Sequence, residues 1–309
     1  MVALVTPLQG DEVDYSALET LYRIHAAAGT DAVVVCGTTG ESATLSHREH
    51  EEVIYHAAQF FKNELGPEGP KLIAGTGSNS TREAVSLTRY AAGLEVDAVL
   101  VISPYYNKPT PPGQIAHFTA VARAADPVPV ILYNVPGRTG LKMTLETTLE
   151  LAEIPNIAAI KEASGDMGLI SEIVRRAPEG FQVISGEDNL TFPMMALGCV
   201  GTISVSANIV PERMREMVHS CLDENYSEAR TIHQELFQLT EALFRETSPI
   251  PVKTALNLMA GTPGPGGIEW PSVGELRMPL VEMSPAGKKV LMERLSELHL
   301  HAGSGVATR

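Results

Sequence analysis

Residues 157–165 of the chain read IAAIKEASG, a short apolar run that carries a lysine near its end. Apolar runs of about four to eight residues, bounded by turn residues, are typical of strands in a parallel sheet whose two faces are both covered. Other runs along the chain have the same character. The eight candidate strands are residues 2–7, 31–37, 71–77, 97–104, 129–135, 157–164, 181–188 and 200–207.

Helix-like segments lie between these strands, for example residues 14–29 and 81–95. Strict alternation of strand and helix indicates a parallel sheet, and eight repeats favour closure into a (β/α)8 TIM barrel, which takes about 250 residues. A doubly wound open sheet is the competing fold, but no glycine-rich dinucleotide fingerprint follows the first strand. We therefore predict an α/β fold, a TIM barrel with a C-terminal helical extension.

The strand pattern stops near residue 225, and helical periodicity replaces it. We expect residues 1–225 to form the barrel with the active site and residues 226–300 to form a C-terminal helical domain. Residues 301–309 are small and polar, and we expect a disordered tail.

Composition and charge exclude several classes of protein. The chain has 309 residues, of which 44% are hydrophobic and 19% charged, as in ordinary globular proteins. A net charge of -14 argues against nucleic acid as a partner. No apolar stretch approaches the ~20 residues of a membrane helix, and the first residues lack a signal-peptide pattern. We expect a cytoplasmic protein that does not bind membranes.

Three cysteines, at wide spacings, give neither a disulfide framework nor a zinc pattern. We expect Cys36, Cys199 and Cys221 to be buried apolar groups, because no local histidine would activate any of them. The predicted strand ends carry no His, Asp and Glu cluster with ligand spacing, so we expect no metal site.

Lys161 lies among apolar residues of a predicted strand. A lysine at a strand end commonly extends its ammonium into solvent. If Lys161 instead points into the barrel mouth, desolvation lowers its pKa and gives a neutral amine that can form a Schiff base with a ketone. The resulting iminium acidifies the adjacent carbon without a metal or an organic cofactor.

Polar groups follow other predicted strands, at the barrel end where active sites lie. Residues 37–42 read GTTGES and lie at a predicted strand-to-helix junction. Backbone amides at a helix start, together with the hydroxyls of Thr38 and Thr39, suit a carboxylate, although a plain turn is the alternative. Tyr133 ends a strand, where its hydroxyl could lie near Lys161 inside the barrel mouth. The alternative is that its ring only contributes to packing. Arg138 suits a substrate carboxylate, although a lone loop arginine is usually solvated.

Five motifs follow one another in fixed order: GTTGESATL (37–45), PYYNKP (104–109), YNVPGRTG (133–140), IKEASG (160–165) and ISVSAN (203–208). Together they resemble the dihydrodipicolinate synthase family, now called 4-hydroxy-tetrahydrodipicolinate synthase, of the class I Schiff-base pyruvate lyases and aldolases. The resemblance covers nearly the whole chain and is of the bacterial type. It implies a lyase that condenses pyruvate with L-aspartate 4-semialdehyde in diaminopimelate and lysine biosynthesis.

The resemblance implies catalytic roles for four residues. Lys161 would condense with pyruvate, and Tyr133 would shuttle protons during imine formation. Thr38 would link Tyr133 to Tyr106, which would reach in from a neighbouring subunit. A hydroxyl relay of this kind passes protons without placing a full charge beside the iminium.

Four further residues would bind the substrates. Thr39, Gly186 and the backbone carbonyl of Ile203 would line the pyruvate pocket. Arg138 would hold the carboxylate of the semialdehyde, which favours the synthase over relatives whose second substrate is a sugar-derived aldehyde.

A second set of residues matches the feedback site at which family members bind L-lysine between two subunits: Ser42, Ala43, His47, His50, Asn79, Glu83 and Tyr105. Glu83 can meet an ammonium, and Asn79 and Tyr105 can donate or accept hydrogen bonds. The alternative is that residues 46–52 are the solvated start of a helix. Ser248 stands where some bacterial members carry Asn.

The resemblance also implies a homotetramer, arranged as a dimer of dimers. It implies no cofactor other than the covalent Schiff base with pyruvate. Two other functions stay open at this point: a related pyruvate-dependent aldolase acting on a sugar-derived aldehyde, and a non-catalytic barrel that binds a keto acid.

Overall fold

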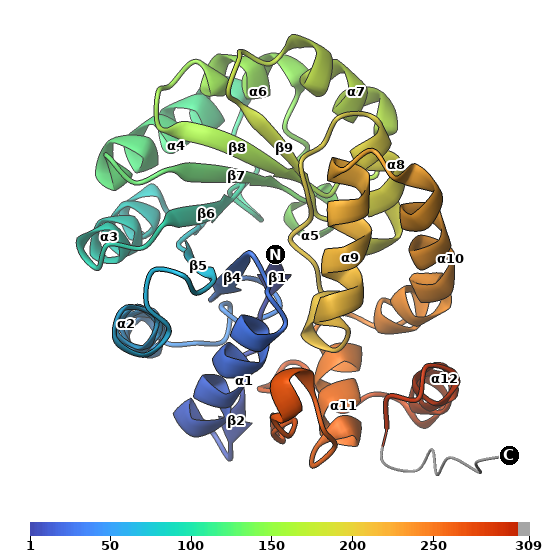
Figure 1. Cartoon of the computed structure of the whole chain (residues 1–309). Helices are drawn as coiled ribbons and strands as arrows, with labels where there is room; N and C mark the ends of the chain where they lie inside the picture. Colours follow the sequence, from blue (N-terminus) through green and yellow to red (C-terminus); the bar gives the residue numbers. More distant parts are fainter. Residues whose placement is uncertain (302–309) are drawn as a thin grey trace, which may run out of the picture.

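A parallel sheet forms the centre of the protein. The structure, a computed structural model, describes residues 1–301, so that the tail predicted for residues 301–309 lies outside the described residues except for His301. Seven strands follow one another in the sheet in the order β1, β4, β5, β6, β7, β8 and β9, and all neighbours are parallel (Figure 1). Their bounds are Val2–Ala3, Ala32–Val35, Lys71–Gly75, Ala98–Ile102, Val130–Asn134, Ile157–Glu162 and Gln182–Ser185.

The eighth predicted run, residues 200–207, closes the sheet into a barrel. It does so through isolated bridges from Thr202 to Ser185 of β9 and from Ser204 to Val2 of β1. The amide of Ala3 donates to the carbonyl of Ser204 at 2.8 Å. A regular strand does not form, because the chain turns into a short 3-10 helix at Ser206–Asn208. The predicted (β/α)8 barrel is confirmed, with its eighth strand reduced to these bridges.

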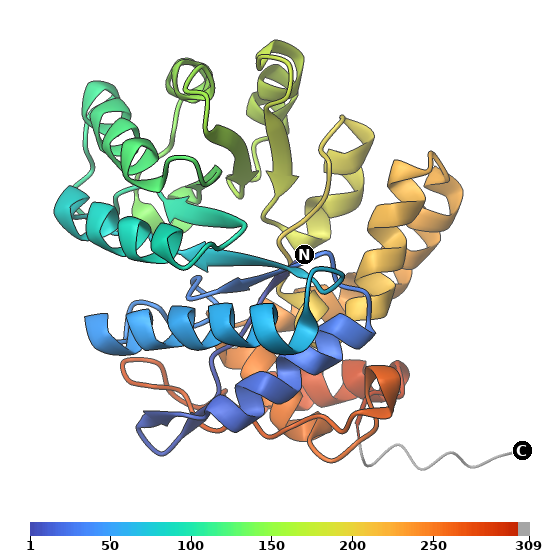
Figure 2. The same ribbon diagram turned by 60° about the vertical axis from the view of Figure 1, so that its left-hand side comes forward.

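Helices surround the sheet on its outer side, as the two views in Figure 1 and Figure 2 show. The helices of the barrel are α1 (Tyr15–Ala27), α2 (His47–Phe60), α3 (Thr81–Gly93), α4 (Pro111–Ala125), α5 (Pro136–Thr139), α6 (Leu145–Ala152), α7 (Met167–Arg176), α8 (Thr191–Ala196) and α9 (Pro211–Leu222). Helix α2 begins with a capping box, in which the Ser46 hydroxyl accepts from the amide of Glu49 and the Glu49 carboxylate accepts from the amide of Ser46. A π-helical turn, Phe61–Leu65, prolongs α2.

Three helices follow the barrel: α10 (Tyr226–Leu243), α11 (Ile250–Met259) and α12 (Pro285–Glu297). Helix α10 packs against α9 and α12, so the predicted C-terminal helical extension is confirmed. The division of the chain into two domains at residue 225 stays a prediction. Within residues 1–301, none of the helices combines the length and the hydropathy that crossing a membrane requires.

One element has no counterpart among the predicted strands. Leu8–Gln9 (β2) and Glu12–Val13 (β3) form a two-residue antiparallel hairpin. Gly10 in its turn has a φ of 61°, in the left-handed region that glycine adopts without strain. The hairpin is too short to show an alternating pattern in the sequence.

Side chains of alternating strand positions fill the barrel interior. This inner cluster contains small and branched residues, among them Ala3, Val34, Leu100, Ile131 and Ile203. A larger cluster of apolar residues packs between the sheet and the helices. Both faces of the sheet are therefore covered, as the continuous apolar runs predicted.

Gly75 lets two strand ends approach closely beside the loop that follows β4. A Cβ atom at this position would lie 2.2 Å from the carbonyl oxygen of Cys36. We predict that Gly75→Ala lowers the free energy of unfolding by about 1–3 kcal/mol, because the backbone must shift to relieve the overlap. Thermal or denaturant unfolding measures the change.

Gly93→Ala is the matched control. A Cβ atom at this exposed position at the end of α3 meets nothing within 4 Å, so stability should stay the same or rise by a few tenths of a kcal/mol. Equal stability of the two variants would contradict the packing described here.

Candidate active site

Lys161 lies on β8 inside the barrel mouth. Ala159 and Ala163, two residues away on either side, belong to the inner apolar cluster, and side chains alternate between the faces of a strand. The Lys161 side chain is 5% exposed. Its Nζ lies 4.4 Å from the centroid of the Tyr133 ring, which the sheet register places directly beside it on β7. The alternative of a lysine that extends into solvent is therefore wrong.

The environment of Lys161 favours the neutral amine. Burial lowers its pKa from the usual 10.5 to about 8, and the positive charge of Arg138 acts in the same direction. The carboxylates of Asp188 and Glu187 oppose this effect, although burial is the largest cause. With a pKa of about 8, roughly one molecule in ten carries a neutral, nucleophilic amine at pH 7.

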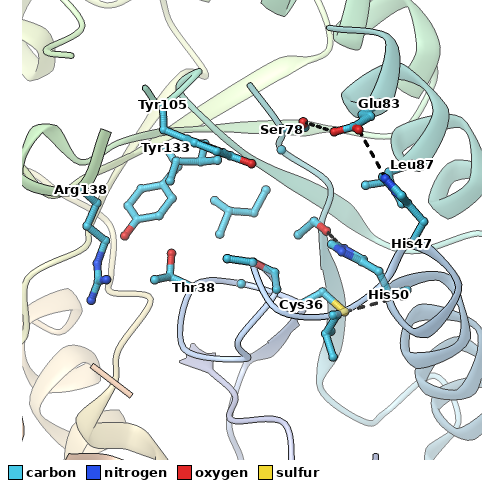
Figure 3. Close-up of a pocket in the computed structure, with 18 residues that line it drawn as sticks. Cys36, Thr38, His47, His50, Ser78, Glu83, Leu87, Tyr105, Tyr133 and Arg138 are labelled. Atoms are coloured by element: carbon cyan, nitrogen blue, oxygen red, sulfur yellow. Dashed lines mark hydrogen bonds and ion pairs between the residues drawn. The ribbon is translucent and has the colours of Figure 1, made fainter. Parts of the chain in front are cut away.

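Tyr133 supplies a protonated hydroxyl next to this amine. Burial raises the pKa of Tyr133 to about 12, while Arg138 and a hydrogen bond with the Thr38 side chain lower it to a smaller extent. In Figure 3 the hydroxyls of Tyr133 and Thr38 point toward one another, and Arg138 extends past them on the same side. A phenol of this kind can donate a proton to, or accept one from, a group bound at Lys161.

Residues 37–42, which carry Thr38 and Thr39, fold into successive turns. The amide of Gly40 donates to the Gly37 carbonyl at 3.1 Å, and the amide of Glu41 donates to the Thr38 carbonyl at 3.1 Å. Helix α2 begins only at His47, so the amides of this loop are not a helix N-terminus, contrary to the expectation from the sequence. Thr39 is 4% exposed.

Gly186, directly after β9, lies close to Lys161, and Ile203 belongs to the next run along the barrel. A Cβ atom at Gly186 would lie 3.0 Å from Cε of Lys161 and 2.7 Å from Cβ of Ala163. Glycine at this position therefore leaves room for the lysine side chain. Ile203 is fully buried in the inner cluster, and its amide donates to the Ser185 carbonyl at 2.9 Å.

Arg138, on the short helix α5, joins the barrel to the segment that precedes α11. Its Nη2 donates to the backbone carbonyl of Ser248 at 3.1 Å. The Ser248 side chain is buried, and its hydroxyl has no hydrogen-bond partner. The guanidinium is only partly engaged, since other N–H groups are left to bind an anion.

Tyr106 is not brought to Thr38 within one chain. Its side chain is 88% exposed, and its backbone has a φ of 71°. The amide of Tyr106 donates to the Thr139 carbonyl at 3.3 Å, and Tyr106 is not part of the cavity wall. Tyr105, the preceding residue, lines the cavity instead.

A cavity of about 390 Å³ extends from Thr38, Tyr133 and Arg138 to the start of α2. Its wall includes six of the seven residues predicted to bind L-lysine: Ser42, Ala43, His47, His50, Glu83 and Tyr105. Asn79 is not part of the wall, and its backbone carbonyl accepts from Nδ2 of Asn107. Lys161 is not in the wall either, and its Nζ lies over the Tyr133 ring.

Hydrogen bonds hold the polar side chains at the far end of this cavity. Oε1 of Glu83 lies 3.3 Å from Nε2 of His47, and Oε2 accepts from the Ser78 hydroxyl at 2.6 Å. Nε2 of His50 lies 2.7 Å from the Gly75 carbonyl, and burial lowers the pKa of His50. Figure 3 shows Glu83, His47 and His50 around the end of the cavity opposite Arg138.

Sequence reasoning missed several residues of this region. Ser78 orients Glu83, and Cys36 lines the cavity between its two ends. Asp188 is buried and accepts from the amides of Val205 and Ser206 at 3.0 and 2.7 Å. The sequence SGED (185–188) carries the one signal that could have found it, two acids directly after a buried strand.

The three cysteines are free and buried, as expected. Burial raises the pKa of each thiol, to about 12 for Cys199. None of them is therefore a thiolate nucleophile near neutral pH. Among residues 1–301, no group of three or more His, Cys, Asp and Glu side chains could hold a metal ion.

Comparison with protein families and curated proteins gives consistent matches. Residues 1–298 match the model of the dihydrodipicolinate synthetase family. The 4-hydroxy-tetrahydrodipicolinate synthase of Aquifex aeolicus is 46% identical over 301 residues, which cover 97% of each chain. The enzyme of the same name from Methanosarcina barkeri is 47% identical over 300 residues, which cover 96% of this chain and 97% of the relative.

Solved structures agree with these matches. The crystal structure of dihydrodipicolinate synthase from Aquifex aeolicus has a TM-score of 0.89 at 46% identity and covers 97% of both chains. A structure of the enzyme from Cyanidioschyzon merolae with lysine bound has a TM-score of 0.89 at 40% identity, again with 97% of both chains. The chloride-inhibited enzyme from Acinetobacter baumannii complexed with pyruvate has a TM-score of 0.87 at 40% identity and covers 97% of this chain and 98% of its own.

The lowered pKa of Lys161 gives a testable pH dependence. A lysine whose pKa is lowered is protonated, and unreactive, below that pKa and becomes neutral above it. We predict that labelling of Lys161 by a trace of acetic anhydride rises roughly tenfold per pH unit below about pH 8 and then levels off. Peptide mass spectrometry measures the labelled fraction, and exposed Lys288 in the same samples serves as the reference for reagent reactivity. A midpoint near pH 10 for Lys161 would contradict the effect of burial.

Proposed function

The chain belongs to the dihydrodipicolinate synthetase family, and we propose that it acts as a 4-hydroxy-tetrahydrodipicolinate synthase. This enzyme is a lyase that condenses pyruvate with L-aspartate 4-semialdehyde in diaminopimelate and lysine biosynthesis. The observation that carries the proposal is the buried amine of Lys161, with its pKa near 8, at the carboxyl end of a barrel strand.

The reaction begins with attack of the neutral Lys161 amine on the keto carbon of pyruvate. Loss of water gives an iminium, in which the positive nitrogen withdraws electrons from the neighbouring methyl carbon. Loss of a proton from that carbon gives an enamine, whose carbon attacks the aldehyde carbon of the semialdehyde. The iminium supplies the electron sink, so the proposed reaction uses no further cofactor.

Tyr133 is proposed to carry protons during these steps. Its phenol is protonated and lies beside Lys161, which suits donation to the oxygen that leaves as water. We propose that Thr38 continues this path from Tyr133 and that Tyr106 of a neighbouring subunit completes it. The 88% exposure of Tyr106 supports a role outside its own chain.

Binding of the two substrates is proposed to use separate groups. Thr39, Gly186 and the carbonyl of Ile203 surround the position of pyruvate. Arg138, which keeps free N–H groups beside its bond to Ser248, is proposed to bind the carboxylate of the semialdehyde. We also propose a homotetramer, arranged as a dimer of dimers, that works in the cytoplasm.

The far end of the cavity is the proposed site of feedback inhibition by L-lysine. Glu83 can pair with an ammonium, and Tyr105 and His47 lie close enough to bind the polar groups of an amino acid. Ser42, Ala43 and His50 complete the cavity wall. Asn79 is outside the wall and is proposed to contact the ligand only after a change of its loop.

Reduction with borohydride in the presence of pyruvate tests the proposed chemistry. We expect a stable pyruvyl adduct on the peptide that contains Lys161, and consumption of the semialdehyde by the untreated protein. Arg138→Ala should still form the adduct but should lose roughly 10- to 100-fold or more in kcat/KM for the semialdehyde, because a charge-assisted carboxylate contact contributes about 1.5–3 kcal/mol.

Each result of this experiment separates one hypothesis from another. Absence of an adduct on Lys161 would reject Schiff-base catalysis and leave a barrel that only binds a keto acid. An adduct together with undiminished semialdehyde turnover by Arg138→Ala would reject the carboxylate contact. Lys161→Arg is the negative control, because its guanidinium stays charged.

Inhibition by L-lysine gives a separate prediction. Glu83→Gln keeps the size of the side chain but removes the charge that pairs with an ammonium. We expect the lysine concentration for half inhibition to rise roughly tenfold or more, while kcat without lysine stays the same. Assays of semialdehyde turnover at increasing lysine concentrations measure this, with Glu146→Gln on the surface of α6 as the control. Equal inhibition of the two variants would reject the site.

A further inference from the structure

A second buried lysine lies close to the substrate loop and has no part in the proposed mechanism. Lys253 on α11 is 1% exposed, and Glu41 is 4% exposed. Nζ of Lys253 lies 2.8 Å from Oε1 of Glu41, although the two residues are 212 positions apart in the chain.

Every polar group of this pair has a partner. Nζ of Lys253 donates to Oε1 of Glu41 and also to the carbonyls of Thr6, at 3.1 Å, and Glu275. An ammonium has three N–H groups, so all of them are used. The other oxygen of Glu41, Oε2, accepts from the amide of Arg277 at 3.0 Å. The pair therefore joins the loop at residues 37–42 to α11 and to the segment that contains Glu275 and Arg277.

Glu41 is tied to the backbone that positions Thr38 and Thr39. It follows Thr39 by two residues, and its amide donates to the Thr38 carbonyl. Its φ is 55°, a left-handed conformation that a residue with a side chain rarely adopts. The preceding residue, Gly40, is held by the Thr6 hydroxyl, which donates to its carbonyl at 2.7 Å. The hydrogen bonds of the Glu41 side chain therefore stabilise this left-handed backbone conformation, which is unfavourable for the loop by itself.

We propose that Glu41 and Lys253 are positioning residues that hold the Thr38–Thr39 loop against the keto acid bound at Lys161. The segment around α11 would then be a required part of the site, although it contributes no group to the reaction. This inference rests on the proposed function, since it assigns Thr38 and Thr39 to proton transfer and pyruvate binding.

A purely stabilising role is the competing explanation, and the physics of buried ion pairs separates the two. Replacing both partners of such a pair by apolar residues of similar size is often neutral or stabilising, whereas removing one partner leaves a buried charge without compensation. A double variant can therefore keep the fold while it loses the loop geometry. Stability and pyruvate binding should change independently in it.

The experiment compares Glu41→Gln, Lys253→Met and the double variant Glu41→Met/Lys253→Met with the parent protein. We expect KM for pyruvate to rise roughly tenfold or more in the double variant while its melting temperature stays near that of the parent, because a small displacement of binding groups is costly. KM for the semialdehyde should change much less, because Arg138 is held by Ser248 and not by this loop. The exposed pair of Lys62 and Glu95, at 2.9 Å, supplies the control double variant Lys62→Met/Glu95→Gln.

Borohydride trapping with increasing pyruvate provides the second readout. The double variant should need correspondingly more pyruvate for half-maximal adduct on Lys161. An unchanged pyruvate dependence in a folded double variant would overturn the inference, and so would a loss of activity that only follows the folded fraction. Failure of the parent protein itself to form the adduct would instead reject the proposed function, so the two hypotheses fail in different ways.

Discussion

The site depends on a lysine amine buried without a directly bonded carboxylate. Among residues 1–301, two lysines are buried, and burial lowers the pKa of both. Lys253 donates to Glu41 and to two backbone carbonyls, and these acceptors hold its amine as an ion in a fixed place. Lys161 faces the ring of Tyr133, and the acids near it, Glu187 and Asp188, raise its pKa less than burial lowers it. The same residue type thus serves as a fixed cation at one position and as a candidate nucleophile at the other.

Packing around Lys161 keeps this environment. Ala159 and Ala163 flank it on the strand, and Gly186 leaves the space into which its Cε extends. Larger side chains at these positions would displace the lysine side chain. A Cβ atom at Gly186 alone would lie 3.0 Å from Cε of Lys161. Parallel register places the Tyr133 ring beside it without any contribution from a flexible loop. Lys161 and Tyr133 therefore lie on strands of the sheet, while Thr39, in the loop at residues 37–42, and Arg138, on α5, lie outside it at the positions proposed to bind carboxylates.

Local patterns predicted much of this arrangement. The apolar runs located all strands of the barrel, because covered parallel strands are apolar on both faces. The ends of those runs located Lys161, Tyr133 and the loop at residues 37–42. The two-residue hairpin was not predicted, because it is too short to show an alternating pattern. The reduced eighth strand was not predicted either, because its bridges join it to distant segments. The same holds for the pairing of Glu41 with Lys253, since 212 residues separate the partners. Lys253 nevertheless showed the signal that identified Lys161, a lysine inside the apolar sequence IPVKTAL.

One cavity is lined by Thr38, Tyr133 and Arg138 at one end and by the proposed effector groups at the other. Few residues lie between the two ends. Nε2 of His50 is bonded to the Gly75 carbonyl, and the Cys36 thiol lies 3.8 Å from the His50 carbonyl. Gly75 in turn abuts the backbone of Cys36, two residues before Thr38. A ligand that shifts His50 therefore acts on the backbone that positions Thr38. Because binding free energies are reciprocal, any change in pyruvate affinity caused by lysine must be matched by an equal change in lysine affinity caused by pyruvate. Regulation of this site then needs no conformational change over a long distance, only a displacement that the close contact of Gly75 with Cys36 transmits.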